Sequence, residues 1–299
     1  MNKKLIFFLL SCLVSNTINS LIFHEYYLDL FKEEPVPTEY LAYKLLKKNP
    51  IKKNINYLAV PWTQLIHKNQ LDKAPNIKLN GGFTICQHID YEKIMPILEK
   101  IGINVLFAPH VNKQYKNITV LPFAHVAVNG ISPRLNKDIF YSFIGLERTH
   151  WTRKEIFNMK HSKNTVIIER KDWHFWINKQ NSKELELRQN KEKKEYQDVL
   201  ARSIFSLCPR GTGASTIRFW ESLKSGSVPV LIADDMMLPA GFDWNSCIIK
   251  LEEKNVKNIP TILSNISAEK YTQMSINCIK AYSLFSGKNF VRTIRDYFK

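Results

Sequence analysis

The chain has 299 residues, enough for one large domain or two ordinary ones. Hydrophobic residues make up 44% of it, which excludes wholesale disorder, and the formal net charge of +16 favours anionic partners. The charge names no partner by itself, because much of it lies in the lysine-rich run 178–196, which is typical of a solvated helix.

The first twenty residues differ from the rest of the chain. Lys3 and Lys4 precede the apolar run 5–14, and a polar tail follows, which is the pattern of a signal peptide. The apolar run is shorter than the roughly 20 residues that a membrane span needs. We expect residues 1–20 to be a leader or weak membrane anchor; the alternative is a first strand of the fold.

Strand-like and helix-like segments alternate after this leader. This pattern predicts an α/β fold in which helices cover parallel sheets. The expected strands lie within 19–31, 55–62, 81–89, 104–110, 117–123, 139–145, 164–170, 204–209 and 227–234. The expected helices lie within 38–49, 90–102, 152–159, 196–203 and 216–225, followed by a helical C-terminus.

We expect the charged segment 179–195 to mark the boundary between two domains. We therefore expect an N-terminal domain over residues 21–177 and a C-terminal domain over residues 178–299. The five cysteines are scattered without a C-x-x-C pair or a Cys/His cluster of zinc spacing. We expect no disulfide framework and no zinc site, and the thiols to be small core residues.

The loop between the strand at 204–209 and the helix at 216–225 carries two closely spaced glycines, Gly211 and Gly213. It matches neither common phosphate-binding fingerprint, because Thr216 stands where the dinucleotide motif has its third glycine and no lysine lies in the loop. A strand–loop–helix turn of this kind still points free N–H groups and the positive helix end at an anion. The sequence therefore predicts an anion site here.

Side chains around this loop suit the same ligand. Arg210 can grip a diphosphate with two parallel hydrogen bonds, and Ser215 or Thr216 can cap the helix. Glu221 has carboxylate oxygens suited to a ribose diol; the alternative is a salt bridge with Arg218, three residues away.

The residues from Leu207 to Trp244 resemble a known family. The order Pro-Arg-Gly, Ser, Arg-Phe-x-Glu, Gly-x-Val-Pro-Val, Leu-Pro and Trp is similar to the donor half of exostosin-type glycosyltransferases, glycosyltransferase family 47. The N-terminal half matches more loosely, through "YLAVPW", "NITVLPF" and "YSFIG" with a downstream arginine. The likeness is strongest over residues 196–251 and begins after the leader.

The resemblance implies two Rossmann-like domains that face a cleft, the GT-B type of fold, with the acceptor side in residues 21–177 and the nucleotide-sugar site in residues 178–299. It implies an inverting transfer of a sugar from a UDP- or GDP-linked donor to a glycan acceptor, without a metal or other cofactor. The donor-site arginine, serine and glutamate carry over to Arg210, Ser215 and Glu221. The expected donor-binding set also includes Gly211, Gly213, Thr216 and Arg218. A further donor-site arginine carries over to Arg153, although Arg148 also fits the spacing.

An inverting transfer also needs a base on the acceptor hydroxyl. We expect it in the N-terminal domain, just past a strand end, where α/β proteins bind their ligands. The candidates are His88, Asp90 and His110, of which one is expected to act. Asp90 is equally suited to cap a helix, and both histidines to be ordinary buried or surface residues; His125, His150 and His174 rank lower.

Two other patterns receive structural interpretations. Asp234 and Asp235 are adjacent acids without the spacing of a metal-binding Asp-x-Asp, and are read as the start of a polar loop. Trp173 and Trp176 suit a sugar face, but core packing or a hydrophobic hinge is favoured.

Two alternatives to an enzyme remain. One is a catalytically silent glycan- or nucleotide-binding scaffold of the same family. The other is a nucleic-acid binder, which is disfavoured because no recognised module is present. We expect membrane association through the N-terminus, in the Golgi or secretory lumen of a eukaryote or at the cytoplasmic face of the inner membrane of a bacterium.

Overall fold

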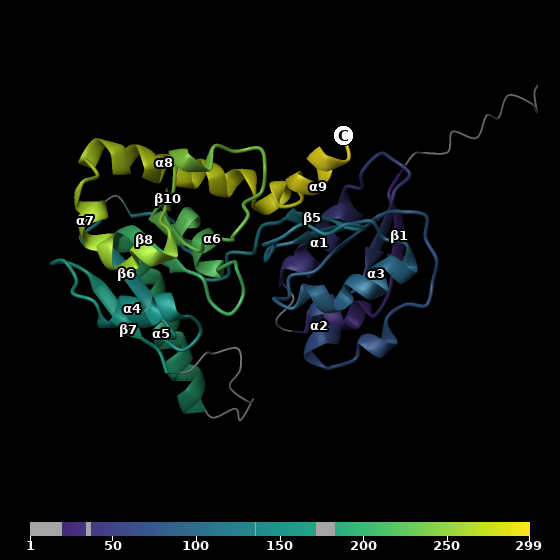
Figure 1. The fold of residues 1–299 in the computed structure, drawn as a ribbon, viewed down its shortest axis with the longest axis horizontal. Helices are drawn as coiled ribbons and strands as arrows, with labels where there is room; N and C mark the ends of the chain where they lie inside the picture. The colour runs from purple at the N-terminus through teal and green to yellow at the C-terminus, as the bar shows by residue number, and fades with distance from the viewer. Residues whose placement is uncertain (1–19, 34–36, 135, 172–182) are drawn as a thin grey trace, which may run out of the picture.

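The computed structural model describes residues 20–33, 37–134, 136–171 and 183–299. Within these residues the chain forms two parallel five-stranded sheets, each covered by helices (Figure 1). The predicted α/β class with two Rossmann-like units is confirmed. The expected leader at 1–20 lies outside the described residues, apart from Ser20.

The first sheet has the strand order β1-β2-β3-β4-β5, and every neighbouring pair is parallel. Because all five strands are parallel, their carboxyl ends form one continuous edge. This edge carries the loops that we expected to hold the base. The strands are β1 (Ile22–Glu25), β2 (Asn56–Ala59), β3 (Phe83–Ile85), β4 (Val105–Ala108) and β5 (Thr119–Pro122).

The second sheet has the order β10-β9-β8-β6-β7, again all parallel. Its central strand β8 leads directly into the glycine loop. The strands are β6 (Ile139–Gly145), β7 (Val166–Glu169), β8 (Ser203–Pro209), β9 (Val228–Ile232) and β10 (Ile249–Lys250).

The expected domain boundary between residues 177 and 178 needs correction. Strand β6 pairs with β8, with Ile139 opposite Ser203, so the second sheet already includes residues 139–169. The chain passes from one sheet to the other between Pro122 and Ile139. The charged run does not mark a domain boundary. Most of it lies in the largely exposed helix α5 (Lys183–Arg202), which connects β7 to β8 within the second sheet.

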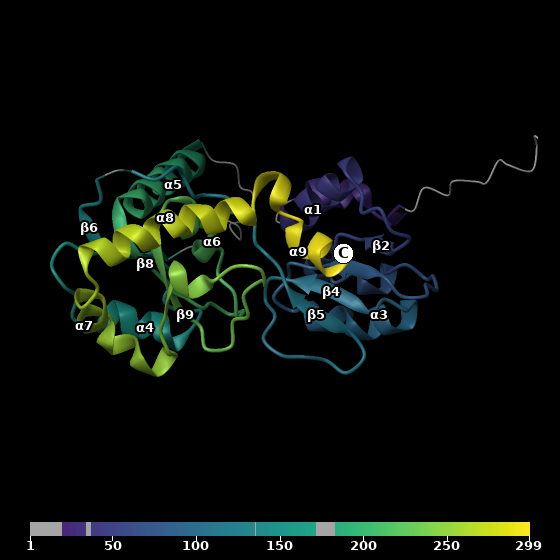
Figure 2. The ribbon, with the colours of Figure 1, turned by 90° about the horizontal axis from the view of Figure 1, so that it is seen from above.

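Helices cover both faces of each sheet. In Figure 2, α5, α6 and α8 lie on one side of the second sheet, and α4 and α7 on the other. In the first unit, buried residues of α1 belong to the same core cluster as Tyr57, Phe83 and Phe107, whereas α2 and α3 cluster with Leu58 and Leu106. This alternation along the strands is the two-residue period expected of a sheet buried on both faces. The bounds of these helices are α1 (Pro37–Lys48), α2 (Trp62–His67), α3 (Met95–Ile101), α4 (Trp151–Asn158), α6 (Ile217–Lys224), α7 (Ile259–Ser264) and α8 (Ala268–Leu284).

The last helix, α9 (Arg292–Tyr297), leaves the second unit and packs on the first sheet (Figure 2). The ring of Phe298 lies 5.1 Å from that of Phe83 and 6.4 Å from that of Phe107. The expectation that residues 178–299 form only the second domain is therefore also corrected.

Two further features can be examined in the described part of the chain. Four of the five cysteines lie in it, and all four are free and buried, as predicted for core residues. No helix within it combines the length and the apolar character needed to cross a bilayer.

Candidate functional site

The glycine loop begins where β8 ends and α6 begins, at the carboxyl edge of the second sheet. The Arg210 N–H still donates to Ile232 O of β9, so the loop leaves the sheet only after Arg210. Thr216 is the N-cap residue of α6, but its side chain makes no capping hydrogen bond. The loop's first-turn N–H groups therefore lie at the positive end of this helix, as the sequence predicted.

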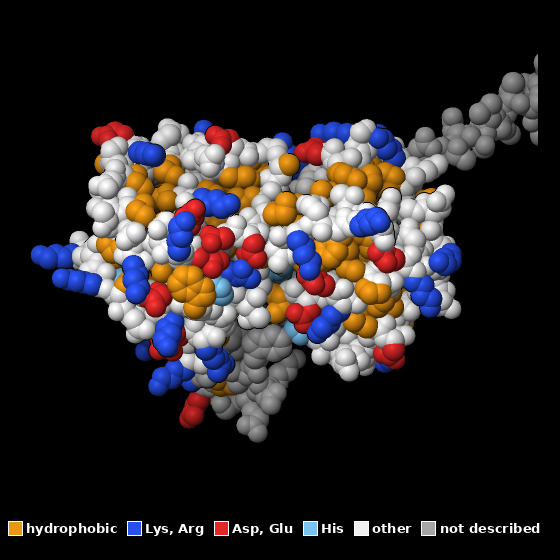
Figure 3. Space-filling model, viewed as in Figure 1, with side chains coloured by type: hydrophobic (Ala, Val, Ile, Leu, Met, Phe, Trp, Pro, Cys, Tyr) orange, Lys and Arg blue, Asp and Glu red, His pale blue; other side chains and the backbone are white. Residues whose placement is uncertain are grey.

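Arg210 is held by acidic side chains from neighbouring loops. Its Nη1 lies 2.7 Å from Asp235 Oδ1 and 3.9 Å from Glu253 Oε1. Glu253 is itself fixed, because Asp234 N donates to its Oε1 at 3.2 Å and its own N–H donates to Asp234 Oδ1 at 2.9 Å. Figure 3 shows acidic, basic and histidine side chains gathered near the middle of this face of the molecule.

Three buried polar atoms around the loop have no hydrogen-bond partner within the protein: Arg210 Nε, Ser215 Oγ and Thr149 Oγ1. Ser215 as a whole is only 6% exposed. Thr149 is next to the loop, since a Cβ built on Gly211 would lie 3.8 Å from its Oγ1. Buried polar groups are normally paired, so a group of unpaired donors marks a place where a polar ligand is expected.

Arg153 supports the loop from beneath. Its Nε donates to Arg210 O at 2.8 Å, its Nη2 to Pro209 O at 3.3 Å and its Nη1 to Leu146 O at 3.3 Å. Burial lowers the pKa of this guanidinium to about 9, so it stays charged at neutral pH. Of the two arginines that fitted the family pattern, Arg153 contacts the loop, whereas Arg148 is exposed.

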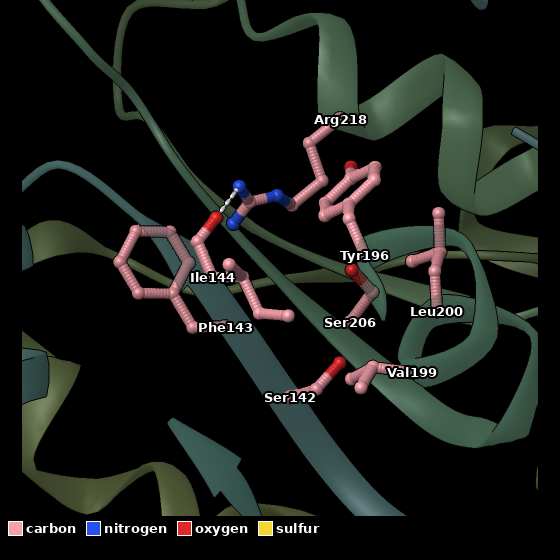
Figure 4. A pocket seen from close by; sticks show the side chains of 8 residues that line it. All are labelled: Ser142, Phe143, Ile144, Tyr196, Val199, Leu200, Ser206 and Arg218. Carbon is pink, nitrogen blue, oxygen red and sulfur yellow. Dashed lines mark hydrogen bonds between the residues drawn. The ribbon is translucent and has the colours of Figure 1, made fainter. Parts of the chain in front are cut away.

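The side chains of Arg218 and Glu221, both on α6, are engaged by other elements of the fold and not by the glycine loop. The Arg218 guanidinium donates to Ile144 O and lies 4.5 Å from the ring centre of Phe143 and 5.5 Å from that of Tyr196 (Figure 4). The space that these side chains surround is too small to admit a water molecule. Arg218 is therefore placed in the packing between the sheet and its helices, so its expected role in donor binding is corrected.

Glu221 is 3% exposed, and both of its carboxylate oxygens have partners. Oε1 accepts the N–H of Asn129 at 2.8 Å, and Oε2 accepts the Tyr196 hydroxyl at 2.6 Å. These bonds connect α6 to the segment between the two sheets and to α5. A ribose diol would have to displace both partners, so this geometry does not favour the expected ribose role of Glu221.

His110 joins the first unit to the glycine loop. Its Nδ1 accepts the N–H of Ser215 at 3.2 Å. The contact is so close that a Cβ on Gly213 would lie 2.5 Å from His110 Nδ1 and 2.7 Å from Ile89 Cγ2, which only glycine avoids. Burial lowers the pKa of His110 to about 4, so the ring is neutral at pH 7 and carries its proton on Nε2.

The ring of His88, like that of His110, is neutral and carries its proton on Nε2. Its Nδ1 accepts the N–H of Asp90 at 2.9 Å, and burial lowers its pKa to about 4. The neutral ring therefore presents an Nε2–H donor. Asp90 is the remaining candidate base; its carboxylate pairs with Lys93 at 2.7 Å, and this hydrogen bond keeps its pKa below the usual value.

Two features of this edge were missed from the sequence. His88, His110 and His125 follow β3, β4 and β5 within two or three residues, and His67 is the last residue of α2, the helix that follows β2. The rings of His67 and His88 are 4.6 Å apart, and those of His110 and His125 are 5.1 Å apart. The placement of His88, His110 and His125 just past successive strands was the available signal, but His125 was ranked below the other two and His67 was not considered.

Glu39 is the second missed feature. It lies in the first turn of α1, is 1% exposed, and its Oε1 accepts Thr63 Oγ1–H at 2.7 Å and Gln87 N–H at 2.9 Å. Burial raises its pKa to about 7. Nothing in the local sequence distinguishes it from an ordinary acidic residue at a helix start.

The remaining sequence interpretations can be placed as follows. Asp234 and Asp235 bind Glu253 and Arg210 respectively, and no group of acidic, histidine or cysteine side chains in the described part of the chain could hold a metal ion. Trp173 and Trp176 lie outside the described residues. A cavity of about 290 Å³ at the amino ends of β2, β3 and β4 is lined by Asn54, Asn56 and other residues of the opposite strand edge.

Comparison with known proteins gives consistent results. The model of the exostosin GT47 domain matches residues 95–266. An exostosin-1 homolog of Caenorhabditis elegans is 37% identical over 30% of this chain and 24% of its own length. A probable beta-1,4-xylosyltransferase of Arabidopsis thaliana is 28% identical over 62% of this chain and 46% of its own. A probable glucuronosyltransferase of Oryza sativa subsp. japonica is 26% identical over 72% and 51%.

The chain thus spans about a quarter to a half of the length of these relatives. Among solved structures, the pneumococcal O-GlcNAc transferase GtfA in complex with UDP and GlcNAc gives a TM-score of 0.40 at 9% identity, over 86% of this chain and 59% of that chain. The family model covers more than half of the chain, including the whole glycine loop and its flanking elements. On this evidence the chain belongs to the exostosin family, glycosyltransferase family 47.

Proposed function

We propose that this protein is an inverting, metal-independent glycosyltransferase that moves a sugar from a nucleotide-diphosphate donor to a glycan acceptor. The observation that carries the proposal is the group of unpartnered polar atoms on Arg210, Ser215 and Thr149 around the glycine loop. The atoms on Arg210 and Ser215 can donate to phosphate oxygens, and the hydroxyl of Thr149 can do the same. Family membership supports the choice of a sugar donor over another anion.

The positive charge for the leaving diphosphate comes from the protein in this proposal. Arg210 supplies a guanidinium, and Gly211 and Gly213 supply backbone N–H groups near the N-terminal end of α6, whereas the Ser215 N–H is held by His110. Asp235, which now pairs with Arg210, must give way to the more highly charged diphosphate. Thr216 extends the same set of N–H donors into the first turn of the helix.

The acceptor hydroxyl is deprotonated by Asp90 in this scheme. His88 and His110 present Nε2–H donors, because the Nδ1 of each ring accepts a backbone N–H. They suit hydrogen bonds to sugar or diphosphate oxygens better than proton abstraction. Asp90 is partly exposed, with 44% of its side chain accessible, and its lowered pKa keeps it ionised near neutrality.

Calorimetry of nucleoside diphosphates against the protein tests the donor site. Loss of one charged hydrogen bond costs about 1.5–3 kcal/mol, so Arg210→Ala should weaken binding of UDP or GDP by roughly ten- to a hundredfold. Arg292→Ala is the matched control, because Arg292 also pairs with an aspartate, Asp296, but lies on α9. Equal affinity of wild type and Arg210→Ala would refute the assignment.

Turnover distinguishes the enzyme from the scaffold. Release of the nucleoside diphosphate from a UDP- or GDP-sugar, with or without a glycan acceptor, is expected for the enzyme. Tight nucleotide binding without any release or transfer would support the catalytically silent alternative. Membrane association through the N-terminus is part of the proposal and would be tested by fractionation of the full chain.

A further inference from the structure

A line of four side chains runs outward from the diphosphate-binding arginine. Arg210 Nη1 lies 3.9 Å from Glu253 Oε1, and Glu253 Oε2 lies 3.8 Å from His150 Nε2. The ring of His150 is in turn 5.9 Å from the ring of Trp151. The four residues come from three loops that meet at the carboxyl edge of the second sheet.

The order of chemical groups along this line is informative. A guanidinium is followed by a carboxylate, an imidazole and an indole. A nucleoside diphosphate presents its parts in the same order: phosphates, then a ribose with two neighbouring hydroxyls, then a flat aromatic base.

His150 and Glu253 offer complementary hydrogen-bonding groups. His150 caps α4, and its Nδ1 accepts the N–H of Thr152 at 3.4 Å. Burial lowers the pKa of His150, so the ring is neutral at pH 7 and its proton lies on Nε2. The 3.8 Å between this Nε2–H and Glu253 Oε2 is too long for a hydrogen bond, so the donor and the acceptor both remain able to bind a third group. A pair of hydroxyls, one accepting and one donating, satisfies both.

Trp151 is an unusual residue to find on the surface beside such polar groups. It is 50% exposed, whereas the other tryptophans whose exposure is described, Trp62, Trp220 and Trp244, are buried or partly buried. It is the first residue of α4 and its ring is tilted by 40° from that of His150. An accessible indole face is a good stacking surface for a nucleobase.

We propose that Trp151, His150 and Glu253 form the nucleoside half of the donor site. Trp151 stacks on the base, and His150 and Glu253 bind the two ribose hydroxyls. This inference rests on the proposed donor site at Arg210, and it assigns to Glu253 the ribose contact that the sequence had suggested for Glu221.

The test compares three probes in calorimetry: UDP or GDP, whichever binds more tightly, its 2′-deoxy analogue, and inorganic pyrophosphate. Trp151→Ala should weaken nucleotide binding about tenfold and leave pyrophosphate binding unchanged, since one base–aromatic stack is worth about 1–3 kcal/mol. Leu187→Ala removes an exposed apolar side chain from α5 and is the matched control, with no change expected for any probe.

Glu253→Gln separates the ribose contact from the phosphate contact. It should weaken the ribonucleotide more than the deoxynucleotide, and it should not weaken pyrophosphate, because a negative charge near Arg210 is removed. Melting temperatures check that each variant is folded.

The outcomes are distinguishable. If the ribonucleotide binds in an Arg210-dependent way but neither Trp151→Ala nor Glu253→Gln discriminates between the probes, the nucleoside assignment is wrong and the donor site stands. If the wild type binds neither nucleotide nor pyrophosphate, the donor site fails and the nucleoside assignment fails with it.

Discussion

Glu39 makes the stability of the protein depend on pH in a defined direction. Its carboxyl is buried, and burial raises its pKa from the ordinary value of 4.5 to about 7. The unfolded chain loses this proton at a lower pH than the folded protein does. Between these two values the folded state therefore binds more protons, and stability falls as the pH rises towards 7 and beyond.

The structure sets the size of this effect. For these two pKa values, the linkage relation gives a loss of about 2 kcal/mol between about pH 5.5 and about pH 8.5. Glu39→Gln keeps an oxygen that can accept from Thr63 Oγ1 and Gln87 N, but it has no proton to lose. The free energy of unfolding of the variant should therefore fall by about 2 kcal/mol less than that of the wild type over this range.

Urea unfolding of both proteins at the two pH values measures the difference. Histidines that titrate in the same range act equally in both proteins and cancel. Glu99→Gln, which changes an exposed carboxyl of α3, should behave as the wild type does. Parallel pH dependence in wild type and Glu39→Gln would show that the buried carboxyl does not titrate in this range, and would refute the reasoning.

Three further predictions concern the proposed active site. Asp90→Asn should lower turnover by roughly 10²–10⁴ while nucleotide affinity and melting temperature hold; near-wild-type turnover would place the base elsewhere. Gly213→Ala should lower stability by about 1–3 kcal/mol and weaken nucleotide binding, because its Cβ would lie 2.5 Å from His110 Nδ1 and 2.7 Å from Ile89; unchanged thermal unfolding would contradict this contact. Turnover should survive an excess of chelator, since Arg210 and the loop amides supply the positive charge; a loss restored by manganese or magnesium would show that a metal is required.

The sequence was informative where function depends on local pattern. The alternation of strands and helices predicted both sheets, and the loop from Pro209 to Thr216 predicted an anion site that has unpartnered donors in the structure. These features depend on residues that are neighbours in the chain. The periodicity of a strand and the glycines of a turn can be read within a few residues.

The sequence was less informative where several loops meet. The partners of Glu221 are Asn129 and Tyr196, which are 92 and 25 residues away, and no local pattern shows that they occupy its carboxylate. Glu253 and His150 are likewise far apart in the sequence, and no local pattern shows that their side chains lie close together. The domain boundary was misplaced for a related reason, because a charged helix on the surface of a sheet has the same composition as a linker.

The return of α9 to the first sheet has a consequence for the way the protein is made. The first sheet is synthesised before the second, but its aromatic core includes Phe298, which lies beyond the second sheet in the sequence. The nascent first unit therefore lacks the cover of Phe298 on the rings of Phe83 and Phe107 until residues 292–298 have left the ribosome. Contacts of such long sequence separation form slowly. The first unit is thus completed only after the second sheet has been made, and a chain that lacks α9 and Phe298 should expose this aromatic surface and aggregate during synthesis.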